Sequence, residues 1–201
     1  MFTLSAATSL LSLLVSVATL WLVFFSPGKL KMTKPTVIYF GSDASGSDGH
    51  KVYFRALLYS TAKRGVVVEQ LYVRMRRGET VQNFSIWVHG DGTLSRGSGM
   101  FIGQEGVVTN HHFLQPPTGN EITFTSGLYE MQVFARIVGR KRSVAIGTVN
   151  LDVSQEQATF LRRADYGLYF DWGPESETYH AVLKPSSPQQ KMGKEFHQVA
   201  T

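Results

Sequence analysis

Apolar and polar side chains alternate most clearly in residues 51–76, which read KVYFRALLYSTAKRGVVVEQLYVRMR. In the first half, one face carries Val52, Phe54, Ala56 and Leu58, and the other carries Tyr53, Arg55, Leu57 and Tyr59. A period of two is typical of a half-buried β-strand. Residues 62–65 (AKRG) supply a turn, and the alternation then resumes as far as Arg76. The segment predicts consecutive strands joined as a hairpin or meander.

Similar patterns extend over the rest of the chain, whose 201 residues suit one domain. They predict strands at 36–40, 84–88, 100–103, 106–113, 121–125, 129–138 and 143–153, and a final strand at 167–172. Ser154 and Gln157 match a capping box, so one short helix is expected near 154–163. A spacing of about ten residues between turns favours a sandwich over an α/β fold, which needs repeated helices. We therefore expect an all-β, antiparallel β-sandwich over residues 36–184.

The turn before one of these strands contains Gly127-Leu128-Tyr129. It resembles the Gly-x-Tyr start of a late strand in immunoglobulin-like and fibronectin-like sandwiches, where a tyrosine hydroxyl ties down a corner. The resemblance covers about ten residues, and the chain lacks the Cys, Trp and Cys pattern of antibody domains. It implies an immunoglobulin-like architecture and no particular activity.

The amino-terminal residues 1–28 contain no charged side chain, and residues 10–25 are dominated by Leu, Val, Phe and Ala. Roughly 20 helical residues cross a hydrocarbon core about 30 Å thick, so this stretch predicts a transmembrane anchor helix in the lipid bilayer. A cleavable signal peptide is the alternative, because Ser16-Val17-Ala18 offers small residues for cleavage. No Lys or Arg precedes the apolar run, which favours an uncleaved, single-pass anchor.

Lys29, Lys31 and Lys34 follow the anchor, so residues 29–35 are expected to form a basic juxtamembrane linker. The positive-inside rule then places the sandwich in the cytoplasm, with an extracytoplasmic position as the alternative. Residues 185–201 are rich in Pro, Ser, Gln and Lys, so a disordered tail is expected there.

The net charge of +5 bears on partners. Without the three lysines after the anchor, 17 basic residues face 15 acidic ones, so the rest of the chain is nearly neutral. This balance, and the lack of a stacking-aromatic motif or groove-reading helix, argue against a nucleic-acid partner. The chain has no cysteine, which excludes disulfides, thiolate metal sites and a cysteine nucleophile. It also lacks phosphate-binding and dinucleotide-binding motifs, so no cofactor is expected.

Residues 97–102 (GSGMFI) and 106–112 (GVVTNHH) are the sharpest chemical motif. They are similar to the stretch around the catalytic histidine of trypsin-like serine peptidases, and the resemblance implies His112 as general base. The chain departs from that family because it has no Gly-x-Ser-Gly-Gly nucleophile motif, and Ser143-Val144-Ala145 stands where an Asp-x-Ala strand is needed. A metal site at His111 and His112 is not expected either, since adjacent strand residues point to opposite faces.

Aromatic residues gather near the carboxyl end, interleaved with acids, at Tyr166, Tyr169, Trp172 and Tyr179. Aromatic anchors with a polar rim are typical of a recognition surface, so we expect these residues, with Arg74 and Arg76, to contact a partner. The sequence favours a single-pass membrane-anchored, non-catalytic β-sandwich that binds a protein partner, a second copy or a small ligand. A membrane-tethered hydrolase using His112 is the alternative.

Overall fold

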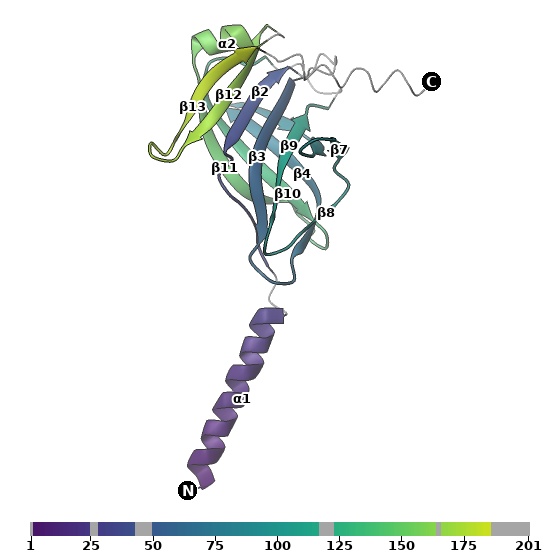
Figure 1. Cartoon of the computed structure of the whole chain (residues 1–201), viewed down its shortest axis with the longest axis vertical. Coiled ribbons are helices and arrows are strands. Elements are labelled where there is room, and N and C mark those ends of the chain that lie inside the picture. The colour runs from purple at the N-terminus through teal and green to yellow at the C-terminus, as the bar shows by residue number, and fades with distance from the viewer. Residues whose placement is uncertain (1, 25–27, 43–49, 117–122, 164–165, 186–201) are drawn as a thin grey trace, which may run out of the picture.

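The chain folds into a two-layered β-structure from which one helix projects, as the computed structural model shows (Figure 1). The structure describes residues 2–24, 28–42, 50–116, 123–163 and 166–185; the side chains of residues 2–4, 22 and 42 are not described. The predicted disordered tail therefore lies outside the described residues, apart from Pro185.

Two antiparallel sheets form the layers. Sheet A runs in the order β13 (Thr178–Pro185), β12 (Tyr166–Gly173), β2 (Val37–Ser42), β3 (His50–Ser60), β9 (Val107–Leu114), β6 (Ile86–His89) and β7 (Ser95–Arg96), and β1 (Leu30–Met32) also pairs with β3. Sheet B runs in the order β11 (Val144–Val153), β10 (Gly127–Ile137), β4 (Val66–Arg77) and β5 (Thr80–Phe84), and β8 (Met100–Ile102) pairs with β4. The predicted all-β class with two antiparallel sheets is confirmed.

The decisive segment 51–76 forms two strands, but β3 belongs to sheet A and β4 to sheet B. A hairpin between them was therefore the wrong prediction, whereas the next turn does form one, with Arg77 opposite Thr80. The physical reason is that both apolar faces point inwards. Phe54 of β3 and Val73 of β4 are fully buried in one core, which requires the chain to cross from one layer to the other at residues 61–65.

The core lies between the layers and is rich in aromatic rings. Phe40 of β2 is fully buried, and its ring stacks on Phe124 at a centroid distance of 5.3 Å. Tyr129, at the start of β10, contributes its ring to the same cluster. Its hydroxyl donates to the Thr125 carbonyl at 2.7 Å and accepts from the Thr125 N–H at 3.0 Å. The expected tie between this tyrosine and the preceding corner is thus present.

The strand predicted at 121–125 is not formed by residues 123–125, although Phe124 is buried in the core, and residues 121–122 lie outside the described part of the chain. Two other strands occupy segments for which the sequence predicted something else. β1 lies within the expected linker 29–35, pairs with Leu58–Ser60 of β3 and buries Leu30. β13 follows β12, which is therefore not the last strand, and pairs with it along its whole length. The turn at 174–177 connects β12 to β13, so the fold does not end at Gly173.

The predicted short helix forms as α2 (Gln155–Leu161), and both hydrogen bonds of its capping box between Ser154 and Gln157 are present. The other helix, α1 (Phe2–Phe24), points away from the end of the sandwich (Figure 1). No side chain that the structure describes in α1 belongs to the core, and Leu11, Leu14 and Trp21 are each about three-fifths exposed. Taken over the residues whose placement is described, no helix combines the length and apolar character that a membrane crossing requires.

Candidate functional site

The outer face of sheet A carries a row of rings from four neighbouring strands. Tyr169 of β12 lies opposite Tyr39 of β2, Tyr39 opposite Tyr53 of β3, and Tyr53 opposite His112 of β9. The ring centroids are 4.9 Å apart for Tyr169 and Tyr39, 6.5 Å for Tyr39 and Tyr53, and 4.8 Å for Tyr53 and His112. We call these four residues the aromatic row. Cross-strand neighbours on one face meet in this way because side chains alternate along each strand.

Tyr39 is the buried member of the aromatic row: it is 1% exposed and contacts the rings of both Tyr53 and Tyr169. Its ring lies against Gly41 and Gly167, where a Cβ atom on either glycine would overlap it. These two glycines occupy paired positions on β2 and β12, so the absence of a side chain at both positions leaves room for the ring against the backbone. Tyr53, Tyr169 and His112 are half-buried and present the remaining ring surface to solvent.

Charged groups border the aromatic row. Lys184 places its Nζ 4.9 Å from the centre of the Tyr169 ring, and Lys51 places its Nζ 5.6 Å from that of Tyr39. Beyond Tyr53, the Arg55 guanidinium donates to the Asp91 carboxylate at 2.7 Å and to the Asn110 side chain at 3.1 Å. The face therefore combines apolar ring surface with a cationic and polar rim.

Electrostatics keep these groups in defined protonation states. The hydrogen bond from Arg55 to Asp91 holds the pKa of that carboxyl below its usual range, with a further contribution from the Asn110 N–H. Burial raises the pKa values of the Tyr53 and Tyr169 hydroxyls, so both stay neutral phenols at physiological pH. The row can thus donate and accept hydrogen bonds but offers no activated tyrosinate.

The structure separates the six residues predicted to contact a partner. Tyr169 belongs to the aromatic row, whereas Trp172 and Tyr179 pair with each other on the opposite side of the β12–β13 hairpin, 4.9 Å between ring centroids. The Tyr179 hydroxyl donates to the Pro35 carbonyl at 2.8 Å, and burial raises its pKa to about 12, which indicates a structural role. Tyr166 packs on Phe160 of α2 at 5.1 Å.

Arg74 and Arg76 lie on β4, in sheet B, on the side away from the core. The Arg74 guanidinium lies 4.8 Å from the centre of the Phe134 ring, which also stacks on Tyr72. These residues therefore form a surface separate from that of the carboxyl-terminal aromatics.

His111 and His112 have different surroundings, as expected for adjacent strand residues that point to opposite faces of the sheet. His111 is fully buried, and its Nδ1 accepts a hydrogen bond from Trp87 Nε1 at 3.2 Å. Burial lowers the pKa of His111 to about 3, with smaller contributions from His89 and His112, so the imidazole is neutral. His112, the base implied by the peptidase resemblance, instead stacks on Tyr53 at the open sheet face.

One hydroxyl does contact an imidazole elsewhere, since Ser176 Oγ lies 3.0 Å from His180 Nε2 in the turn between β12 and β13. This serine also accepts from Thr178 and contacts the Gly173 carbonyl, so its hydrogen bonds close an exposed turn. Within the described residues, no three His, Asp or Glu side chains are grouped closely enough to hold a metal ion.

Sequence reasoning missed most of the aromatic row. Tyr53 and Arg55 were visible on the outward face of the alternating segment, and Tyr39 in the preceding strand. The missing information was the strand order β12-β2-β3-β9, which brings residues more than 100 positions apart into one row.

No family model matches the chain, and no curated protein matches it. Among solved structures, a family 123 glycoside hydrolase from Clostridium perfringens is similar over 64% of this chain and 27% of its own, with 8% identity and a TM-score of 0.30. Spo0M, a sporulation control protein from Bacillus subtilis, is similar over 87% of this chain and 98% of its own, with 11% identity and a TM-score of 0.25. Neither likeness carries an argument about this chain.

Proposed function

We propose that this protein is a membrane-anchored, non-catalytic β-sandwich that binds a protein partner through the outer face of sheet A. The observation that carries the proposal is the aromatic row, in which the half-buried rings of Tyr53, Tyr169 and His112 rest on the buried Tyr39. Tyr and Arg dominate the energetics of protein interfaces because they offer large contact area and a polar end. The rim of Arg55, Asp91 and Lys184 would add specificity around them.

Preorganisation supports this reading. The rings already contact one another, and Arg55 is already held by Asp91, so little side-chain freedom remains to be lost when a partner binds. Neither Tyr53 nor Tyr169 offers an activated nucleophile, since burial raises the pKa of both phenols and keeps them neutral. Recognition is therefore the chemistry that this arrangement performs best.

Photo-crosslinking in cells that express the full chain tests the binding face. A photoreactive amino acid replaces Val182, which is exposed and lies opposite Tyr169, or, as a control, Val81, which is exposed at the edge of sheet B. We expect a discrete adduct from position 182 only, lost when Tyr53→Ala and Tyr169→Ala are combined. An adduct of twice the chain mass would identify the partner as a second copy, and equal adducts from both positions would contradict the proposal.

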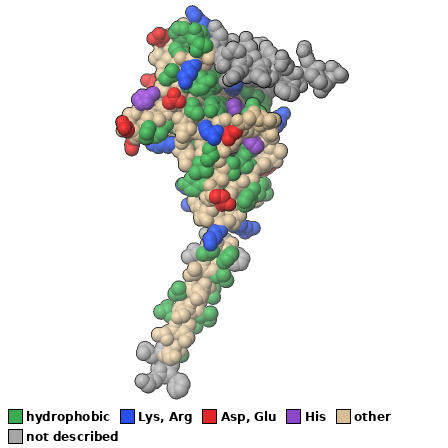
Figure 2. Space-filling view, in the orientation of Figure 1, with side chains coloured by type: hydrophobic (Ala, Val, Ile, Leu, Met, Phe, Trp, Pro, Cys, Tyr) green, Lys and Arg blue, Asp and Glu red, His purple; other side chains and the backbone are tan. Residues whose placement is uncertain are grey.

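We propose the membrane anchor for residues 1–28 as a whole. Support comes from the absence of charge in this stretch and from α1, whose described Leu and Val side chains from Leu10 to Leu20 are more than half exposed and lie outside the core (Figure 2). A helix that exposes many large apolar side chains is stabilised by an apolar environment. Serine and threonine hydroxyls of α1 bond to carbonyls one turn back, for example Ser16 to Ser12 at 2.8 Å, which lowers their cost in lipid. The lysines that follow favour the cytoplasmic side.

Alkaline extraction of membranes tests the anchor. The unaltered chain is expected to stay in the pellet, whereas Leu11→Arg with Leu14→Arg is expected to release it, because each Arg costs about 2.5–3.5 kcal/mol at the centre of a spanning helix. Leu94→Arg with Leu128→Arg adds the same charge at exposed positions of the sandwich and should leave the protein in the pellet. Release of the unaltered chain would contradict anchoring.

We also propose that the sandwich is of the immunoglobulin-like kind. The support is the Tyr129 hydroxyl, which makes both of its hydrogen bonds to the backbone of Thr125, a few residues upstream, as a tyrosine corner does.

A further inference from the structure

The end of the sandwich nearest α1 holds the whole net charge of the chain. Four segments meet there: residues 28–29, 61–65, 103–106 and 138–143. The Thr61 N–H donates to the Lys29 carbonyl, the Ser60 N–H to the Gly103 carbonyl and the Val138 N–H to the Val67 carbonyl. These segments carry six of the 20 Lys and Arg residues and one of the 15 Asp and Glu residues. Basic and acidic residues are therefore equal in number over the remainder. Figure 2 shows basic side chains where the sandwich narrows towards α1.

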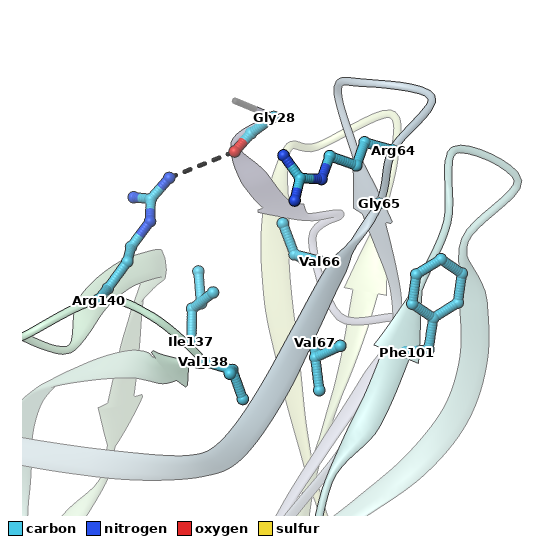
Figure 3. A pocket seen from close by; sticks show the side chains of 9 residues that line it. All are labelled: Gly28, Arg64, Gly65, Val66, Val67, Phe101, Ile137, Val138 and Arg140. Carbon is cyan, nitrogen blue, oxygen red and sulfur yellow. Dashed lines mark hydrogen bonds between the residues drawn. The ribbon is translucent and has the colours of Figure 1, made fainter. Parts of the chain in front are cut away.

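A pocket with a volume of about 300 Å³ opens at this end of the sandwich, which we call the basal end. Figure 3 shows Arg64 and Arg140 on either side of Gly28, above the side chains of Val66, Val67 and Ile137. Arg140 Nη2 donates to the Gly28 carbonyl at 3.3 Å, which ties the guanidinium to the backbone four residues after the end of α1. Neither arginine forms an ion pair with a carboxylate of the described residues, so both charges are available to an anion.

Apolar side chains continue the pocket outwards. Phe101 and Val138 are 61% and 59% exposed, and Val67 beside them is 43% exposed. Large apolar groups beside unpaired guanidinium groups match a ligand that has an anionic head and apolar chains. A free phosphate would use the arginines alone and would leave these side chains in water.

We infer that the basal pocket binds the phosphate of an anionic phospholipid, with Arg64 and Arg140 on the phosphate and Phe101 and Val138 against the lipid chains. The inference rests on the proposed membrane anchor. Gly28 lies four residues after the last residue of α1, and four residues span at most about 14 Å, so the pocket stays within reach of the headgroup layer. Clustered Lys and Arg beside a membrane helix are attracted to anionic lipids. The fold thereby gathers charges that are far apart in the sequence into one lipid-facing surface.

The full chain, reconstituted in bilayers, allows a direct test because it has no native cysteine. Val138→Cys is labelled with an environment-sensitive fluorophore, and emission is compared in phosphatidylcholine and in phosphatidylcholine with phosphatidylglycerol. We expect a blue shift that depends on phosphatidylglycerol. Arg64→Glu with Arg140→Glu should abolish the shift. Arg64→Gln removes one positive charge from a side chain that makes no described hydrogen bond, and it should raise several-fold the phosphatidylglycerol fraction at which the shift is half-maximal.

The matched control is Arg162→Glu with Arg163→Glu, which makes the same charge change beside α2, at the other end of the sandwich, and should keep the shift. An equal shift in phosphatidylcholine alone, or a shift that survives the charge reversal at Arg64 and Arg140, would overturn the inference. So would a shift induced by inorganic phosphate in phosphatidylcholine bilayers, since the site would then read a free anion. Flotation of the vesicles separates the two proposals. If the protein floats with the vesicles but shows no shift, only the lipid-binding pocket is contradicted. If the protein does not float, both the anchor and the pocket are contradicted.

Discussion

Replacing Phe40 with alanine is expected to lower the free energy of unfolding by about 3–5 kcal/mol. The side chain is fully buried on β2, and its ring contacts Phe124, Tyr129 and Phe170 at centroid distances of 5.3, 6.1 and 5.1 Å. Alanine removes the burial of the ring and leaves a cavity that rigid aromatic neighbours cannot fill. A loss of this size is a large part of the roughly 5–15 kcal/mol that stabilises an ordinary domain.

Urea unfolding of the full chain in detergent, followed by near-ultraviolet circular dichroism, measures this loss. Leu128→Ala is the control, because Leu128 is 63% exposed on β10 and its truncation should change the free energy of unfolding by less than about 0.5 kcal/mol. Tyr53→Ala, on the outer face, should lower the free energy of unfolding by less than Phe40→Ala does, because Tyr53 is only half-buried. Equal destabilisation by Phe40→Ala and Leu128→Ala would mean that the aromatic cluster is not the centre of the core.

The sequence alone predicts most of the strands because their period is local. The alternation in residues 51–59 places Val52 and Phe54 inside and Tyr53 and Arg55 outside, and the structure has the same arrangement. The capping box of α2 is equally local, since Ser154 and Gln157 are three residues apart. What a local pattern lacks is the choice of partner strand. The same alternation fits a hairpin within one sheet or a crossover between two, and only the shared core of both layers decides for the crossover.

The candidate site depends on that missing choice. Tyr169 and Tyr53 were separate features of the sequence, and the pairing of β12 with β2 and of β2 with β3 makes them neighbours through Tyr39. Composition near the carboxyl end pointed to Trp172 and Tyr179 as well, but the pleat turns them to the other side of the hairpin. The basal charge has the same origin: Arg64 and Arg140 are 76 positions apart and share one pocket.

Acid is expected to destabilise the protein through His111. The imidazole is fully buried next to Trp87, and its pKa of about 3 in the folded state lies below the ordinary value of 6.5 that the unfolded chain should show. At pH 7 both states hold a largely neutral ring. Below about pH 6.5 the His111 imidazole binds a proton in the unfolded state but not in the folded state. The free energy of unfolding therefore falls as the pH falls from 6.5 towards 3. The loss between pH 7 and pH 5 is about 2 kcal/mol, at up to about 1.4 kcal/mol per pH unit.

Urea unfolding at a series of pH values, on the unaltered chain and on His111→Gln, isolates this contribution. Glutamine keeps an acceptor for Trp87 Nε1 but takes up no proton, so the variant should lose most of the decline between pH 7 and pH 5 whatever its stability at neutral pH. His180→Gln, on the exposed hairpin, is the matched control and should decline as the unaltered chain does. If the stability of His111→Gln declined as steeply as that of the unaltered chain, the acid sensitivity would come from other groups, because a histidine whose pKa is lowered by folding must produce this pH dependence.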